Sequence, residues 1–496
     1  MGERARTPNL DALAAEGAEF LAHYTSTPSC TPARAAILTG LSPWRHGMLG
    51  YGDMAPKYAR ELPAEMAAAS RRATVIGKDH FGWREDAGKP VAHGYEFLQI
   101  YDGLGNGFVN GTNYDDYDRW FQTQQPGRNP LQSGGLNWNT WRGTHYEFAE
   151  ELHPTAWTGR LAVDAIRDFA RAKTPFFLKV SFHRPHSPYD PPQRVLNATG
   201  SPKQPPARAA DGWDNRWRNC PTRGRPDHCC GEVDADSLDL ARRAYLGGVS
   251  FVDEHIGHVI SALRETGLLE DTFILYTSDH GDMQNDHFLW RKSFPWEGSA
   301  HVPLIVRWPR SMEGRIGSPR GSKVAEVTEL RDVLPTFLEV LGRWDGAAEA
   351  HFDGRPVTRL LRGAQQASPW RQWVDLEHNV YCSPEFHWNA LTDGRMKFIF
   401  HAFTGKHQLF NLTADPQEQR DLSGDKHMAA TLELWRGRMV KQFQREGRGK
   451  AWVRNGKLVA RRRPCNYSPN FPRPVRNCRV VDLGLGAEPP SAVLSV

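Results

Sequence analysis

Residues 174–186 read TPFFLKVSFHRPH, a continuous apolar run that leads into two histidines. A short apolar run without polar alternation predicts a strand covered on both faces, as in the parallel sheets of α/β proteins. Comparable runs lie at 73–77, 272–278 and 302–308 (ATVIG, TFILYTS and VPLIVRW), and we expect buried parallel strands there too. Helical spacing marks one apolar helix face at Val252, Ile256, Val259, Ile260 and Leu263. The alternation predicts an α/β sandwich with a large, mainly parallel sheet.

Polar residues stand directly after three of these predicted strands. They are Lys78 and His80 after 73–77, His183 and His186 after 174–182, and Asp279 and His280 after 272–278. In open α/β sheets, ligands bind beyond the carboxyl ends of the strands. An isolated histidine is often a partly buried structural residue. The shared position of all six residues favours one functional site instead.

A second signal is the segment PSCTPARAAILTG at 28–40. Pro32 suits the first turn of a helix, so Cys30 is expected at the positive end of the helix dipole, with Arg34 one turn further on. That environment binds anions and lowers the pKa of a thiol. A lone cysteine near a helix start would be read as a buried structural residue, but Arg34 makes this one a candidate nucleophile.

The remaining patterns outline two domains. TPNLDALAAEG at 7–17 predicts an opening helix that starts after Thr7, and the Pro- and Arg-rich stretch 187–235 predicts a long loop close to the site. From about 366 the pattern changes to a hairpin turn at Asp393-Gly394, a short strand and a terminal helix. We therefore expect a catalytic domain over 1–365 and a smaller α+β domain over 366–496.

Composition narrows the classes of partner. The formal charge of +5 over 496 residues suits an anionic substrate but is too weak to indicate a nucleic-acid partner. No apolar run is long enough to span a membrane. The residues 1–17 contain no apolar core of a signal peptide either.

Cysteines and glycosylation sequons favour an oxidising compartment. Besides Cys30 there are six cysteines in loop-like surroundings, Cys220, Cys229, Cys230, Cys382, Cys465 and Cys478. Six cysteines allow fifteen pairings, and we expect the neighbours Cys229 and Cys230 to bond to different partners. Sequons occur at Asn110, Asn197, Asn411 and Asn466. Together they predict the secretory pathway, with a lysosomal or extracellular destination.

The segment Cys30-Thr31-Pro32-Ala33-Arg34, followed by Leu38-Thr39-Gly40, resembles the signature of the sulfatase family. The resemblance continues in order through GKDHFG, SFHRPHSPYDPP, YLGGVSFVDEHIGHVISAL, TSDHGDMQNDH, HVPLIVRWP and LFNLTADPQEQRDL. It implies an alkaline-phosphatase-like fold and hydrolysis of sulfate esters. It also implies that a formylglycine-generating enzyme oxidises Cys30 to formylglycine, whose hydrate attacks sulfur. HRPH and SDHGD are similar to the iduronate-sulfatase-like and choline-sulfatase-like branches.

The resemblance also implies roles for individual residues. Arg34 stabilises the developing alkoxide, Lys78 and Lys292 hold sulfate oxygens, His186 protonates the leaving alcohol and His80 acts on the hydrated aldehyde. For His183, His287 and His301, a functional role and a structural role are about equally well supported.

The metal site departs from the family pattern. Calcium ligands implied by the resemblance are the modified Cys30, Asp279 and His280, which supply few oxygens for a hard cation. The family adds two consecutive aspartates at the end of its first strand, just before the helix at 7–17, and that strand is absent from this sequence. We expect its absence to expose apolar surface and unpaired backbone groups.

Three functions remain open on these observations. The first is a sulfatase acting on an aryl sulfate, a sulfated sugar or a glycosaminoglycan. The second is a phosphonate or phosphodiester hydrolase of the same fold, since a tetrahedral phosphorus anion suits the same cations. The third is an inactive secreted carbohydrate-binding relative, favoured by the absent aspartates and opposed by the set from Cys30 to Lys292.

Overall fold

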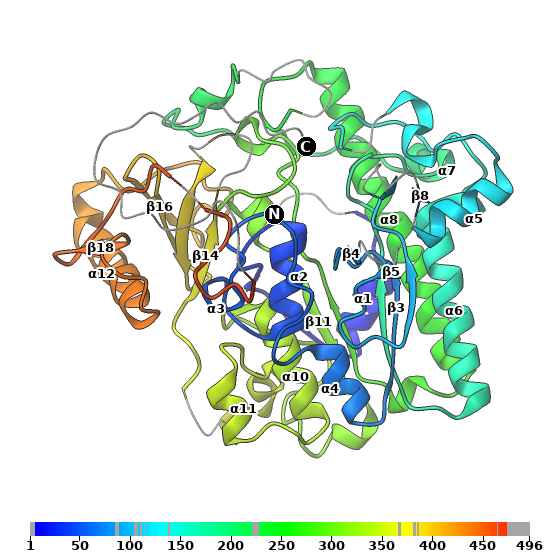
Figure 1. Ribbon diagram of the computed structural model, residues 1–496. Coiled ribbons are helices and arrows are strands. Elements are labelled where there is room, and N and C mark those ends of the chain that lie inside the picture. Colours follow the sequence, from blue (N-terminus) through cyan, green and yellow to red (C-terminus); the bar gives the residue numbers. More distant parts are fainter. Residues whose placement is uncertain are drawn as a thin grey trace.

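The computed structural model describes residues 5–473 apart from 85–88, 104–107, 110–111, 114, 137–138, 221–227, 366–368, 380–382, 384–385 and 464. Two central sheets, flanked by helices on both sides, make up the larger part of the molecule (Figure 1). The first has the order β6-β3-β9 and is parallel throughout. The second has the order β10-β11-β1-β12. Their strands are β3 (Arg72–Gly77), β6 (Phe97–Ile100), β9 (Phe176–Ser181), β10 (Ile274–Thr277), β11 (Leu304–Arg307), β1 (Ala18–Phe20) and β12 (Ser322–Val324).

The strands predicted from apolar runs are present, but two of them, β10 and β11, pair antiparallel with each other. β11, in the run at 302–308, pairs antiparallel with both β10 and β1. The prediction of a parallel strand there was wrong. A continuous apolar run reports that both faces of a strand are covered, and it contains no information on direction. The parallel and buried character of β3 is confirmed.

Helices cover both faces of the central strands. Phe176 and Leu178 of β9 pack against α6 (Pro154–Ala172) and α8 (Ala235–Glu265), while Phe177 packs against α10 (Val333–Val340). This alternation places successive side chains on opposite faces, as the geometry of a strand requires. The opening helix α1 (Pro8–Ala15) buries Leu10 and Leu13 against α8. Other helices are α2 (Cys30–Thr39), α3 (Pro43–His46), α4 (Leu62–Ala68), α5 (Asp116–Gln124), α7 (Gln193–Ala198), α9 (Glu297–Ala300) and α11 (Gly346–His351).

The two central sheets are not joined. β9 is the last strand of one sheet and β10 the first of the other, and within the described residues no strand lies between them. Their side chains are only half-buried along their whole length, although helices cover both faces. Phe337 of α10 contacts Phe177 of β9 at 5.3 Å and Phe273, next to β10, at 5.6 Å between ring centroids. The outer edges of β9 and β10 therefore flank a strip in the middle of the molecule that no described strand fills.

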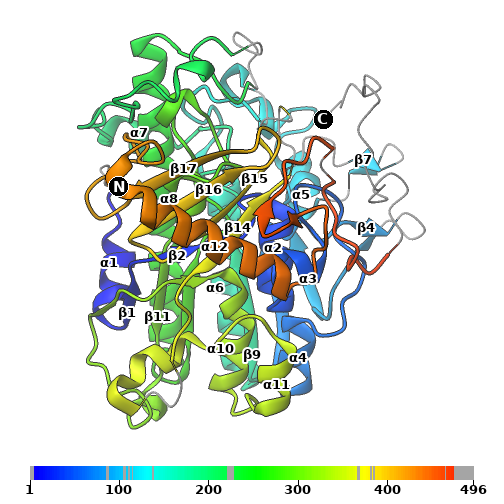
Figure 2. The same cartoon turned by 90° about the vertical axis from the view of Figure 1, so that its left-hand side faces the viewer.

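A smaller antiparallel sheet with the order β14-β15-β16-β17 forms the C-terminal domain, and α12 (Ala429–Arg445) crosses one of its faces (Figure 2). Gly394 has φ +82° in the turn between β15 and β16, which matches the predicted Asp393-Gly394 hairpin. The strands of this C-terminal sheet are β14 (Val374–His378), β15 (Trp388–Thr392), β16 (Met396–His401) and β17 (Lys406–Asn411). Short pairs elsewhere are β13 (Thr328–Glu329) with β2 (His23–Tyr24), β4 (Trp83–Arg84) with β5 (Lys89–Pro90), β7 (Phe108–Val109) with β8 (Thr112–Asn113), and β18 (Val453–Arg454) with β19 (Lys457–Leu458).

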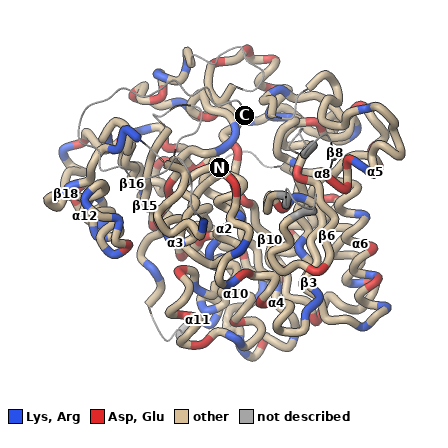
Figure 3. Tube along the Cα trace, in the orientation of Figure 1, with Lys and Arg blue, Asp and Glu red and all other residues tan. Residues whose placement is uncertain are grey.

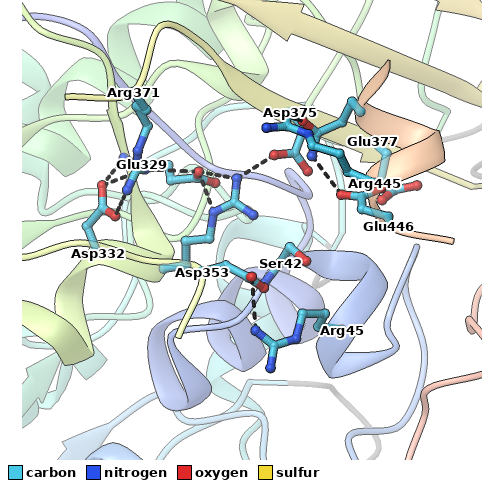
Figure 4. Close-up of polar contacts among 12 residues, drawn as sticks. Ser42, Arg45, Glu329, Asp332, Asp353, Arg371, Asp375, Glu377, Arg445 and Glu446 are labelled. Carbon is cyan, nitrogen blue, oxygen red and sulfur yellow. Dashed lines mark hydrogen bonds and ion pairs between the residues drawn. The ribbon is translucent and has the colours of Figure 1, made fainter. Parts of the chain in front are cut away.

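Buried ion pairs join this domain to the rest of the molecule. Arg371 of the C-terminal region points at Glu329 and Asp332 (Figure 4), with its Nη1 3.1 Å from Glu329 Oε1 and 3.0 Å from Asp332 Oδ2. Arg331 in turn binds Glu329 and Asp375 of β14. Four of these side chains are at most 10% exposed and Asp375 is 11% exposed. The network fixes the two domains against each other.

The structure bears on the predictions for the cysteines and for membrane-spanning segments. Cys220 and Cys230 form a disulfide, so Cys230 bonds to a partner other than its neighbour Cys229, as expected. Cys465 is also disulfide-bonded, and Cys382 and Cys478 lie outside the described residues, as does the sequon residue Asn110. No described helix combines the length and the apolar character that a membrane crossing demands. In the view of Figure 3, basic and acidic residues are mixed along the chain.

Candidate active site

The candidate nucleophile lies at the start of a helix, as predicted. Cys30 is the first residue of α2, is 1% exposed and forms no disulfide. Its Sγ lies 3.3 Å from His280 Nε2 and 3.5 Å from Lys78 Nζ. Burial raises the pKa of this thiol, but the positive charges of Lys292, Lys78 and His280 outweigh burial and bring the pKa well below its usual value.

Arg34 joins the nucleophile helix to the ends of three strands. Its Nε and Nη2 lie 3.0 and 2.9 Å from Asp279 Oδ2, after β10. Its Nη1 donates to the Lys78 carbonyl oxygen after β3, at 2.7 Å, and to Ser181 Oγ at the end of β9, at 3.2 Å. One guanidinium therefore holds together the carboxyl ends of β3, β9 and β10.

His186 and Lys292 form a tight pair beside this centre. Lys292 Nζ is 2.6 Å from His186 Nε2, and His186 Nδ1 is 2.8 Å from the Ser187 carbonyl oxygen. Because a carbonyl only accepts, Nδ1 carries the proton, and Nε2 accepts from the lysine. Burial, together with Lys292 and Lys78, lowers the pKa of His186 well below its usual value. Burial also lowers the pKa of Lys292.

His80 lies in the same turn as Lys78 but is oriented by a residue that sequence reasoning missed. The backbone N–H groups of Asp79 and His80 both donate to Asp102 Oδ1 at 2.9 Å, and His80 Nε2 lies 3.3 Å from the Asp102 carbonyl oxygen. Asp102 comes two residues after β6, so the rule that located the other polar residues at strand ends would have found it.

The other three histidines separate into one near the pocket and two distant from it. His183 accepts from Arg184 Nη1 at 2.8 Å, and its ring lies tilted against that of His186, 5.0 Å away between centroids, at the wall of the pocket. His287 is bound to Asp214 and packs on Trp213. His301 stacks on Tyr24 and pairs with Glu297. The pocket itself is lined by Arg34, Lys78, His183, His186, Asp279, His280 and Lys292, among others.

The described residues provide an incomplete set of metal ligands. Sγ of Cys30, a carboxylate oxygen of Asp279 and a ring nitrogen of His280 all lie within 4.8 Å of one another. Calcium binds six to eight oxygens, and this group offers one carboxylate, which Arg34 already binds through Oδ2. Lys78 adds a further positive charge next to Cys30. These residues alone do not fit a calcium ion.

Comparisons with known proteins agree with this geometry. A family model described as Sulfatase matches residues 1–343, and one described as N-sulphoglucosamine sulphohydrolase, C-terminal, matches 285–445. The chain is 32% identical over 469 residues to an arylsulfatase of Clostridium perfringens (strain 13 / Type A), covering 91% of this chain and 92% of that protein. It is 28% identical over 433 residues to a choline-sulfatase of Rhizobium meliloti (strain 1021), covering 84% and 77%.

Among solved structures, the phosphonate monoester hydrolase of Agrobacterium radiobacter has the same fold, with a TM-score of 0.71, 23% identity and coverage of 93% of this chain and 96% of that one. The fold and site thus define an alkaline-phosphatase-like hydrolase. Within that class, the chain belongs to the sulfatase family. This family generally uses a formylglycine and a metal ion.

Proposed function

We propose that this protein hydrolyses sulfate esters with a formylglycine made from Cys30 as the nucleophile. The observation that carries the proposal is the setting of Cys30: a buried thiol at a helix start, outside any disulfide, with Lys78 Nζ and His280 Nε2 within 3.5 Å of Sγ. The hydrated aldehyde supplies an oxygen nucleophile at this position. The cations around it suit a sulfate group that carries negative charge.

The surrounding residues then divide the remaining work. Lys78 and Lys292 bind the sulfate oxygens as point charges, and Arg34 stabilises negative charge that develops on the oxygen at position 30. As the S–O bond to the alcohol breaks, the leaving oxygen takes the proton shared by Lys292 Nζ and His186 Nε2, which are 2.6 Å apart. His80, held by Asp102, is the candidate group for acting on the hydrated aldehyde.

We further propose that calcium binding needs two carboxylates beyond Asp279, on a strand between β9 and β10. Within the part of the chain that the structure describes, neither strand pairs along the edge that faces the strip between the two sheets, and both are only half-buried there. Arg34 contacts Ser181 and Asp279 at the carboxyl ends of these two strands. Residues at the end of an inserted strand would therefore lie beside Asp279 and His280.

The matched relatives support an inference about the substrate, and the cysteines support one about the compartment. We infer a sulfated aryl compound or sugar as substrate, since matched relatives include an arylsulfatase and a choline-sulfatase. The Cys220–Cys230 disulfide supports an oxidising compartment, and a matched relative is described as an extracellular sulfatase. We therefore propose the secretory pathway, lysosomal or extracellular, with a formylglycine-generating enzyme as maturation partner.

The test compares sulfate and phosphate esters of one phenol. The chain is produced together with a formylglycine-generating enzyme, and oxidation of Cys30 is checked by mass spectrometry of its peptide. We expect turnover of the aryl sulfate to exceed that of the aryl phosphate, and Cys30→Ala to abolish it without a change in fold. Faster phosphate hydrolysis would favour a phosphoryl-transfer enzyme, and turnover that survives Cys30→Ala would contradict the nucleophile.

A further inference from the structure

The backbone on both sides of Lys292 is strained. Arg291 has φ +67° and Ser293 φ +81°, in the left-handed region that side chains other than glycine rarely adopt. Such residues persist only where surrounding contacts hold them in place. The position of Lys292, and with it the 2.6 Å contact to His186, therefore depends on what binds its two neighbours.

Ser293 is held from two directions. Its N–H donates to the carbonyl oxygen of Pro28, two residues before Cys30, at 2.8 Å. Its carbonyl oxygen accepts from the indole Nε1 of Trp388, at 3.0 Å. Trp388 is the first residue of β15 in the C-terminal domain and is 1% exposed. The peptide that follows Lys292 is thus clamped between the nucleophile loop and the C-terminal sheet.

The same sheet makes further contacts with both segments. Lys397 of β16 donates from Nζ to the Pro295 carbonyl oxygen at 2.8 Å and pairs with Glu297 at 2.6 Å. The N–H of Glu377 in β14 donates at 2.8 Å to the carbonyl oxygen of Ser26, in the loop that leads to Cys30. The C-terminal sheet is therefore a common support for the two loops that bring Cys30 and Lys292 together.

We propose that Trp388 is a positioning residue for Lys292, acting through its indole hydrogen bond to Ser293. The inference rests on the proposed function, in which Lys292 binds the sulfate group. Without the indole N–H, the buried Ser293 carbonyl loses its donor, and the strained peptide can rotate toward a relaxed conformation. Lys292 Nζ then leaves its position beside His186 and Cys30.

The test is a double-mutant cycle on Trp388→Phe and Lys292→Ala. Phenylalanine keeps an aromatic ring in the core and removes the donor together with part of the indole volume, an effect that the control below also contains. Sulfate affinity is measured by calorimetry with inorganic sulfate, and turnover is measured with an aryl sulfate. Trp435→Phe is the matched control, because Trp435 is also 1% exposed in the C-terminal domain but packs in a different core, away from residues 292–297.

We expect Trp388→Phe to weaken sulfate binding about tenfold, as for one buried hydrogen bond, with little additional effect in the Lys292→Ala background. Trp435→Phe should lower Tm without changing sulfate affinity. The inference would be overturned if Trp388→Phe left the affinity for sulfate unchanged, or if it weakened binding by the same factor in the Lys292→Ala background. In either case, turnover of the aryl sulfate by the wild type would leave the proposed function standing. If the wild type bound no sulfate but hydrolysed the aryl sulfate, the inference about Lys292 and Trp388 alone would fail. If it did neither, both proposals would fail.

Discussion

Arg34 directs two nitrogens, Nε and Nη2, at a single oxygen of Asp279, Oδ2. The other oxygen, Oδ1, faces His280 Nε2 at 3.8 Å. The Asp279 side chain is 14% exposed, and its pKa lies below its usual value: removal from solvent raises the pKa, but the charges of His280, Arg34 and Lys78 outweigh this effect. The carboxylate is thus held ionised by arginine, with one oxygen turned toward the site of the candidate nucleophile.

Arg34→Lys should therefore damage both stability and activity. Lysine keeps the charge but cannot reach Asp279, the Lys78 carbonyl and Ser181 at the same time. We expect the free energy of unfolding to fall by about 2–3 kcal/mol and aryl-sulfate turnover to fall by about 100-fold. Urea unfolding and steady-state kinetics measure the two effects.

The control for this change is Arg60→Lys, which alters a partly exposed pair with Glu65, also in the N-terminal part of the chain. We expect it to cost less than about 1 kcal/mol and to leave turnover unchanged. Equal effects of the two substitutions on turnover would contradict a special role for Arg34.

The ion pairs at the domain boundary predict a second stability effect. Arg371→Ala removes a cation from Glu329 and Asp332, whose side chains are at most 1% exposed, and leaves charge buried with fewer partners (Figure 4). We expect a loss of about 3 kcal/mol in the free energy of unfolding. Arg45→Ala, which breaks the more exposed pair with Asp353 in the same view, should cost at most about 1 kcal/mol. Similar losses for both would show that the network adds little.

Local patterns in the sequence were enough to locate β3, β9 and β10 and the polar residues after them. That is because an apolar run reports burial, and the ends of parallel strands meet at one edge. The direction of β11 was not predictable in this way, since neighbouring strands decide it. Asp102 and Trp388 act through backbone groups of residues 79–80 and 293. Asp102 stands just after β6, where the same rule would have found it, whereas the contact of Trp388 is a property of the tertiary structure and leaves no periodic signal in the sequence.

Buried histidines predict a loss of stability in acid. Burial lowers the pKa of His401 in β16 from its usual value of 6.5 to about 4. Between these two values, the unfolded chain binds a proton that the folded chain does not, so stability falls as the pH drops below 6.5. At pH 5 this histidine costs about 2 kcal/mol relative to pH 7.

His401→Gln keeps a donor toward Gln408, whose Oε1 lies 2.7 Å from His401 Nε2, and removes the titrating ring. We expect the loss of stability between pH 7 and pH 5 to be about 2 kcal/mol smaller in this variant, measured by urea unfolding at both pH values. The exposed His427→Gln is the matched control. The same pH dependence in His401→Gln and wild type would contradict the prediction.

The last prediction concerns the strip between β9 and β10. Two strand edges without a partner among the described residues, together with half-buried apolar side chains, are costly in the interior of a molecule. A strand placed there pairs with both edges, and two aspartates at its end add anionic oxygens beside Asp279 and His280. Leu10 and Leu13 of α1 pack in one cluster with Ile274 and Tyr276 of β10, so a segment preceding α1 starts close to the strip.

Residues 1–496 by themselves should therefore bind calcium weakly and turn over aryl sulfates slowly, even with Cys30 oxidised, because affinity for a divalent cation falls as its oxygen ligands become fewer and less charged. We expect a version extended at the N-terminus by an apolar strand ending in two aspartates to raise Tm, calcium affinity and turnover together. The same extension ending in two asparagines is the matched control: it should raise Tm, since the strand still pairs, but leave calcium affinity and turnover low. Calorimetry with calcium, thermal unfolding and aryl-sulfate kinetics separate the three proteins, after mass spectrometry has shown equal oxidation of Cys30. Equal calcium affinity and turnover in the original chain and the aspartate version would show that the ligands of the metal lie elsewhere.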